Sequence, residues 1–144
     1  MPEPPNSDAT RAKKALVDAG FEIFRVRGEE IVLAERPREN LIMDSGVRLR
    51  FSEPLEVRVV FRAQKADFPN DDDARLFERV RRLAQPASSS GFVESGCAVT
   101  DVPDPSDSAR TLDSFYEITY AKPVAGLESA LPTLRFAVGL EKHA

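Results

Sequence analysis

The residues with the clearest chemical potential in this sequence are arginines spaced along positions 47–62. In this stretch charged residues alternate with apolar ones, which is typical of two strands with one apolar and one polar face. The arginines on the polar face are Arg48, Arg50, Arg58 and Arg62. Guanidinium groups bind carboxylates and phosphates through paired hydrogen bonds. The hypothesis is that this face binds an anionic ligand or an acidic partner surface, and the alternative is an ordinary solvated face.

The same alternation predicts the register of the hairpin, because a slip of one residue would move the apolar side chains to the solvent face. A three-residue loop at positions 52–54 predicts the cross-strand pairs Val47–Val59, Leu49–Val57, Phe51–Leu55, Arg50–Glu56 and Arg48–Arg58. Glu56 should then offset the charge of Arg50. The pair Arg48–Arg58 sets like charges opposite each other, so it needs a nearby acid, such as Asp44, or an acidic partner.

A second group of arginines, Arg75, Arg79 and Arg82, lies along one side of a helix predicted over residues 74–85. It is read either as a solvated face or as an anion site. The acidic run that precedes this helix, Asp71 to Asp73, does not have the spacing of a calcium loop. We therefore predict that these aspartates cap the helix and occupy its first turn.

The remaining candidates for catalysis are few. Cys97 is the single cysteine and is predicted to be a buried small apolar residue of a strand. His143 is the single histidine and lies next to the last residue, so neither a nucleophile–histidine pair nor a histidine-based zinc site is expected. No glycine-rich phosphate loop is present. We therefore predict no catalytic residue, no metal site and no cofactor.

Composition narrows the class of protein. The 144 residues carry a formal net charge of −4, which argues against a general nucleic-acid binder. One cysteine and the lack of a signal-peptide pattern over residues 1–10 predict a cytoplasmic protein. No apolar run approaches the length of a membrane span, so no membrane association is expected. The predicted organisation is a flexible N-terminal tail over residues 1–6 and a single α+β domain over residues 7–141.

The first half of the chain is predicted to contain a short N-terminal helix and several strands. The helix covers residues 9–19 and ends at Gly20, a residue suited to a left-handed C-terminal cap. Strands over 21–26 and 30–35 follow, joined by a turn at 27–29. Residues 36–46 are ambiguous: Pro37 suits a short helix ending at Gly46, whereas 41–43 suits a strand that turns at 44–46. We favour the strand and turn because Asp-Ser-Gly is a common turn sequence.

The second half begins with the strongly amphipathic helix over residues 74–85, which Pro86 is predicted to end. The elements predicted after it are a loop at 87–91, strands at 92–102 and 112–121 around a loop, a turn of helix at 127–131 and a strand at 133–140. The fold class is therefore α+β, with a mostly antiparallel sheet of hairpins. The predicted core contains Leu49, Phe51, Val57, Val59, Phe61, Phe77, Val80, Leu83, Ile118 and Phe136.

The predicted order of elements, helix–strands–helix–strands, resembles that of acidic secretion chaperones. The resemblance concerns the order of elements alone and implies a non-enzymatic interaction or adaptor-like module that binds another protein or a second copy of itself. Two alternatives stay open. One is a protein that binds a small anionic molecule or a nucleotide through its arginines, and the other is an enzyme that uses carboxylates and arginine without histidine or metal.

Overall fold

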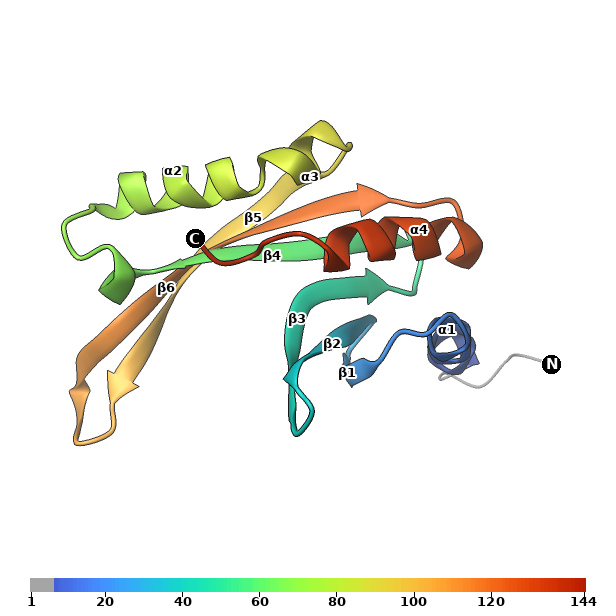
Figure 1. Cartoon of the computed structure of the whole chain (residues 1–144), viewed down its shortest axis with the longest axis horizontal. Helices are drawn as coiled ribbons and strands as arrows, with labels where there is room; N and C mark the ends of the chain where they lie inside the picture. Colours follow the sequence, from blue (N-terminus) through green and yellow to red (C-terminus); the bar gives the residue numbers. More distant parts are fainter. Residues whose placement is uncertain (1–6) are drawn as a thin grey trace. The chain divides into compact units, whose positions relative to one another are not determined.

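The computed structural model describes residues 7–144, so the tail predicted over residues 1–6 lies outside the described residues. Six strands form an antiparallel sheet in the order β1-β2-β3-β4-β6-β5, and four α-helices accompany it (Figure 1). This confirms the predicted α+β class. The helices are α1 (Ser7–Asp18), α2 (Asp73–Leu83), α3 (Gln85–Ser89) and α4 (Leu127–Val138).

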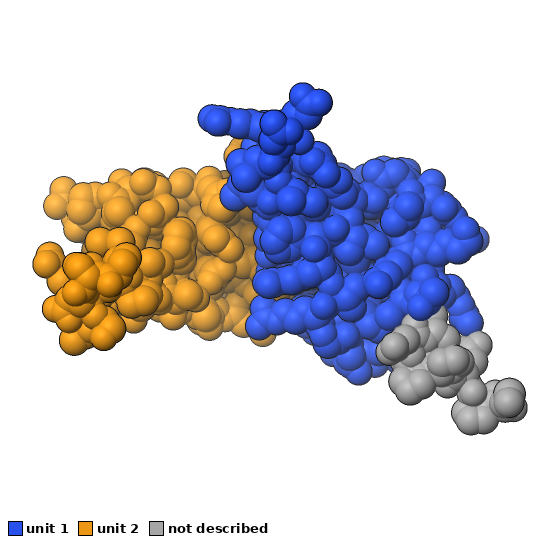
Figure 2. Space-filling model, turned by 90° about the horizontal axis from the view of Figure 1, so that it is seen from below, with its two compact units in different colours: residues 1–59, 122–139 blue, residues 60–121, 140–144 orange. Residues whose placement is uncertain are grey.

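The strands are β1 (Ile23–Arg27), β2 (Glu30–Arg38), β3 (Leu41–Arg50), β4 (Glu56–Gln64), β5 (Val93–Asp104) and β6 (Asp107–Pro123). The chain divides into two compact units, coloured separately in Figure 2. Unit 1 comprises residues up to Val59 together with Lys122–Gly139, and unit 2 comprises Val60–Ala121 and Leu140–Ala144. The single domain predicted for residues 7–141 stays a prediction.

Unit 1 is built on the first part of the central hairpin, whose register is the one predicted. Val47 pairs with Val59, Leu49 with Val57, Arg48 with Arg58 and Arg50 with Glu56. The four apolar residues of these pairs have no exposed surface. They share the core with Ile31 and Leu33 of β2 and with Leu16 of α1. α4 packs against β3, and α1 packs against α4 and β1.

The helix α1 ends as its sequence predicts. Gly20 has a φ of +93°, a left-handed conformation that glycine adopts without a Cβ clash. The amide of Phe21 donates to the carbonyl of Leu16 at 3.0 Å, and the amide of Gly20 donates to the carbonyl of Val17 at 3.0 Å. These two hydrogen bonds form a Schellman ending and satisfy carbonyls that the helix leaves open.

The turn predicted at residues 44–46 is wrong, because β3 runs through these positions as one strand. They form a bulge instead. Val32 and Ala34 of β2 pair with Arg48 and Asp44 of β3, so one residue of β2 lies opposite three residues of β3. Gly46 adopts a φ of +80°, and its amide donates to Asp44 Oδ1 at 2.7 Å. The turn-forming residues thus accommodate the additional residues of a β-bulge within the strand. The alternative prediction, a helix ending at Gly46, is also wrong.

Unit 2 has its own core between α2 and the sheet. Its largest fully buried side chain is Phe61, whose ring meets that of Tyr120 edge to face at 5.6 Å between centroids. Phe77 of α2 meets Tyr116 in the same way at 5.2 Å. The helix begins as predicted, since the side chain of Asp72 accepts a hydrogen bond from the amide of Arg75 at 2.9 Å.

Two predictions about the connections of unit 2 are wrong. Residues 87–91 were expected to form a loop, but α3 begins at Gln85, with Pro86 in its first turn, where a missing amide hydrogen costs nothing. The loop expected between the next two strands shrinks to residues 105 and 106. Asp104 accepts hydrogen bonds from the amide and hydroxyl of Ser106, which allows a tight turn close to Pro103.

The strand predicted over residues 133–140 is also wrong, because these residues belong largely to α4. Alternating apolar residues favoured a strand, yet the buried residues Ala130, Leu134 and Ala137 follow the helical spacing i, i+4, i+7. Phe136 was expected in the core and is 39% exposed. Alanine is small and only weakly apolar, so the helical spacing of the buried residues was not recognised in the sequence.

The last residues of the chain return to β4. The amide of Arg62 donates to the carbonyl of Lys142, and the amide of Ala144 donates to the carbonyl of Arg62, both at 2.9 Å. His143 therefore pairs with Arg62 in parallel orientation. The C-terminal segment of unit 2 is held by backbone hydrogen bonds rather than extending away from β4.

Candidate functional site

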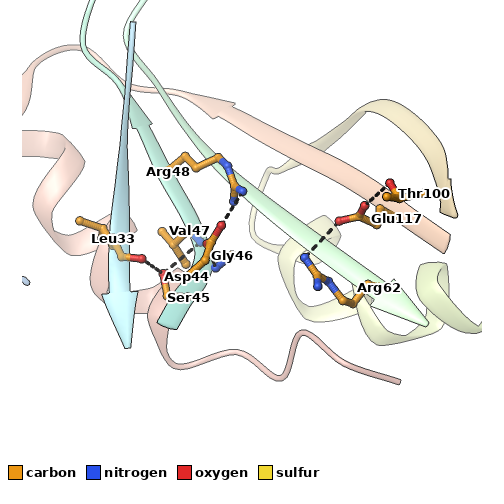
Figure 3. Close-up of polar contacts among 9 residues, drawn as sticks. All are labelled: Leu33, Asp44, Ser45, Gly46, Val47, Arg48, Arg62, Thr100 and Glu117. Atoms are coloured by element: carbon orange, nitrogen blue, oxygen red, sulfur yellow. Dashed lines mark hydrogen bonds and ion pairs between the residues drawn. The ribbon is translucent and has the colours of Figure 1, made fainter. Parts of the chain in front are cut away.

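The predicted arginine site is resolved into separate ion pairs, of which Arg48 provides the first. Its Nη2 lies 2.9 Å from Asp44 Oδ2, the neutralising acid named by the sequence (Figure 3). The bulge at Asp44–Gly46 positions this carboxylate, and Ser45 secures the bulge by donating to the carbonyl of Leu33 at 2.7 Å. The Arg48 side chain is only 15% exposed, and Asp44 offsets its charge within unit 1.

Arg58 has two carboxylate partners. Its guanidinium contacts Glu30 of β2 at 2.9 Å and Glu56 of its own strand. Burial by itself lowers the pKa of Arg58, but the hydrogen bonds and charges of the two glutamates outweigh burial, so its pKa is raised. The like-charge pair Arg48–Arg58 is therefore compensated on both sides by acids of the same unit.

The other two arginines are also paired. Arg50 lies 3.2 Å from Glu29, so the expectation that Glu56 offsets Arg50 is wrong; Glu56 serves Arg58 instead. In unit 2, Arg62 lies 3.1 Å from Glu117 of β6, and Glu117 also accepts a hydrogen bond from Thr100 of β5 at 2.9 Å (Figure 3). The uncompensated positive charge that motivated an anion site is thus absent from these four arginines, and binding there stays a prediction.

The arginines of α2 line a shallow hollow of about 250 Å³ with Asp71 and Glu78. Arg79 pairs with Asp71, and Arg82 pairs with Glu78 at 2.9 Å. The lining therefore mixes both signs of charge, which is typical of a solvated helix face.

The acidic run before α2 has three separate structural roles. Asp72 caps the helix, Asp71 pairs with Arg79, and Asp73 accepts a hydrogen bond from the hydroxyl of Tyr116 at 2.6 Å. Within residues 7–144, no cluster of three or more histidine, cysteine or acidic side chains is arranged to hold a metal ion. The interpretation of the run as a helix start is consistent with these contacts.

The hydrogen bond between Tyr116 and Asp73, together with burial, raises the pKa of Tyr116 to about 12. The ordinary value is about 10, so this contribution to stability is complete below about pH 10 and is lost as the pH rises through about 12. We expect Tyr116→Phe to cost about 1 kcal/mol near neutral pH and to reduce the loss of stability in that alkaline range. Urea unfolding as a function of pH measures both effects.

Tyr120 supplies a reference within the same experiment. Burial raises its pKa as well, so a smaller alkaline loss should persist in Tyr116→Phe. Parallel stability curves for the wild type and the variant between about pH 9 and pH 12 would contradict the assigned role of Tyr116.

Cys97 corrects another expectation: it is exposed, not buried. It lies on β5, the terminal strand of the sheet order, where every residue from position 93 to position 101 is exposed. By contrast, β4, which packs on the core, has only buried and half-buried residues. β5 therefore offers an accessible strand edge, a feature that alternation in the sequence does not reveal.

A hollow of about 300 Å³ lies on the face of the sheet of unit 2. Its lining residues come from β4, β5 and β6: Val60, Gly96, Cys97, Ala98, Glu117 and Thr119. The small side chains at positions 96–98 leave the space, and the ion pair of Glu117 with Arg62 forms its polar side.

Comparison of the chain with models of protein families, with curated proteins and with solved structures found no match. Among the helices of residues 7–144, none combines the length and apolar character needed to cross a bilayer.

Proposed function

We propose that this protein is a non-enzymatic interaction module that captures an extended segment of a partner protein along β5. The observation that carries the proposal is the exposure of β5 at every position from 93 to 101, at the end of the sheet. An added strand forms backbone hydrogen bonds with such an edge, and its alternate side chains enter pockets beside it.

The backbone of β5 supports this mode of binding. In an antiparallel pair, residues alternate between directing their amide and carbonyl groups toward the partner strand and away from it. The pairing with β6 is regular from Gly96 to Val102, so alternate residues of this stretch present free backbone groups on the other side. Within residues 7–144, no strand or loop pairs with that side of β5.

Apolar side chains accompany the free backbone groups. Val93 is 67% exposed and Val99 is 45% exposed, and both lie on β5. A partner strand would cover part of this surface, and burial of apolar area contributes about 25 cal/mol per Å². The hollow at Gly96–Ala98 borders the same stretch on the face of the sheet.

The test uses Cys97 as a reporter, because it is the single cysteine of the chain and lies on the proposed edge. The probe is a peptide of about eight residues in which valine alternates with threonine, a length and pattern suited to a strand. We expect this peptide, at millimolar concentration, to slow alkylation of Cys97 by iodoacetamide. The same peptide with proline at alternate positions cannot complete the ladder and should leave the rate unchanged.

Two neighbouring substitutions supply matched variants. Of Ala98→Pro and Val99→Pro, one removes an amide that bonds to β6 and the other removes an amide that faces outward. The outward variant should retain the stability of unit 2 and lose protection of Cys97 by the peptide. Unchanged alkylation in the wild type at every peptide concentration would contradict the proposal, as would full protection in both variants.

The two alternative functions have less support. An anion site at Arg48, Arg50, Arg58 and Arg62 would have to compete with the carboxylates that already pair with these residues. An enzyme using carboxylates would need a pair of acids held close together in a cleft. The close acids on the sheet of unit 1, Glu30 and Glu56, both contact Arg58.

A further inference from the structure

We propose that the segment captured by β5 is basic, with lysine or arginine alternating with apolar residues. This inference rests on the proposed function, because it specifies the chemistry of the strand that β5 accepts. The basic character of the segment is inferred from the acidic residues along β5, whereas the proposed function was inferred from the exposure of β5.

The edge strand, the turn after it and the first three residues of β6, up to Arg110, carry charge of one sign. Residues 93–109 contain four acids, Glu94, Asp101, Asp104 and Asp107, and neither lysine nor arginine. Glu94 is offset by Arg81 of α2 at 3.1 Å. The other three acids have no ion pair with any lysine or arginine of residues 7–144.

These three carboxylates are held by neutral donors. Asp101 accepts a hydrogen bond from the hydroxyl of Ser114 at 2.7 Å. Asp104 accepts from the hydroxyl and amide of Ser106, and these hydrogen bonds lower its pKa, so its carboxylate is ionised in neutral solution. Asp107 accepts from the amide of Ala109 at 3.1 Å. Neutral donors orient the carboxylates and leave their negative charge in place.

Four acids elsewhere on the sheet are instead neutralised by arginine. Asp44, Glu30, Glu56 and Glu117 each contact an arginine of β3 or β4. Uncompensated negative charge therefore gathers at the β5 edge and its turn. A strand bearing cations would place opposite charges beside these acids, whereas an acidic strand would place like charges there.

The same charges argue against a second copy of this chain as the occupant. Two β5 strands paired edge to edge would bring together acids from both copies without a lysine or arginine in either strand. Like charges directly opposite each other destabilise a strand pair. The observations therefore favour a partner of opposite charge over self-association through β5.

The experiment compares three peptides of about eight residues, in which valine alternates with lysine, threonine or glutamate. Binding is read from the rate of Cys97 alkylation. We expect the lysine peptide to bind at least about twofold, and up to about thirtyfold, more tightly than the threonine peptide, from at most two opposite-charge pairs, with Asp101 and Asp104. The glutamate peptide should bind most weakly. The differences should shrink as the ionic strength approaches about 1 M, where charges are screened beyond about 3 Å.

The variant Asp101→Asn with Asp104→Asn should lose most of the preference for lysine and still bind the threonine peptide. A matched control, Asp8→Asn with Asp67→Asn, removes the same charge from two exposed positions that do not belong to β5 and should keep the preference. Equal affinity of the lysine and threonine peptides would overturn this inference and leave the proposed function standing. A lack of Cys97 protection by all three peptides would overturn both.

Sedimentation without peptide supplies the remaining outcome. We expect that the protein forms no dimer through β5, so the outward proline variant should sediment as the wild type does. A dimer that this substitution dissociates would show a second copy on the edge and would overturn the inference of a basic partner.

Discussion

Replacing Phe61 by alanine is expected to lower the free energy of unfolding by about 3–5 kcal/mol. The Phe61 side chain has no exposed surface, and its ring contacts that of Tyr120 edge to face, with an angle of 86° between the planes. Truncation therefore loses the transfer free energy of the ring, leaves a cavity and removes an aromatic pair. Urea denaturation measures the loss from the midpoint and slope of the transition.

Phe136→Ala is the matched control, because it makes the same change at a residue that is 39% exposed. Part of that ring already contacts solvent, so less apolar area is returned to water, and we expect a loss of about 1 kcal/mol. Equal losses at the two positions would contradict the assignment of Phe61 to the core of unit 2.

Arg58→Ala is expected to cost about 2 kcal/mol, the second largest effect. Removing the guanidinium leaves Glu30 and Glu56 without their shared cation, at side-chain exposures of 22% and 19%. Loss of one partner of a buried pair costs about 3–5 kcal/mol, and the partial exposure here reduces that figure. Thermal or urea unfolding at neutral pH measures the loss.

The matched control is Arg38→Ala at an exposed position, where a change within about 0.5 kcal/mol is expected. Losses of equal size for Arg38→Ala and Arg58→Ala would show that the ion pairs contribute nothing measurable.

Local patterns in the sequence were sufficient for several elements. The register of the β3–β4 hairpin followed from alternation on both sides of a short loop, because a slip would expose residues such as Leu49 and Val57. The start of α2 at Asp72 and the end of α1 at Gly20 followed from capping chemistry that involves neighbours within a few residues. In each case the deciding interactions lie within the element or across one tight turn.

Other features depended on contacts that a local pattern does not contain. The turn of helix predicted at 127–131 lies within α4, but the second half of α4 was predicted as a strand because Leu134, Phe136 and Val138 alternate. The buried face of α4 includes two alanines that packing alone identifies. The partners of Arg58 and Arg62 include Glu30 and Glu117, which are 28 and 55 residues away in the chain. The sequence therefore identified the arginines but did not predict which acids pair with Arg58 and Arg62.

The candidate site itself was decided by tertiary structure. Residues 92–102 were correctly predicted as a strand, but alternation places side chains on two faces without stating whether anything covers either face. β5 ends the sheet order, and each of its residues from 93 to 101, Cys97 and Val99 included, remains exposed. The sequence by itself determined that a strand forms here, and only the order of strands in the sheet left that strand with an unpaired edge.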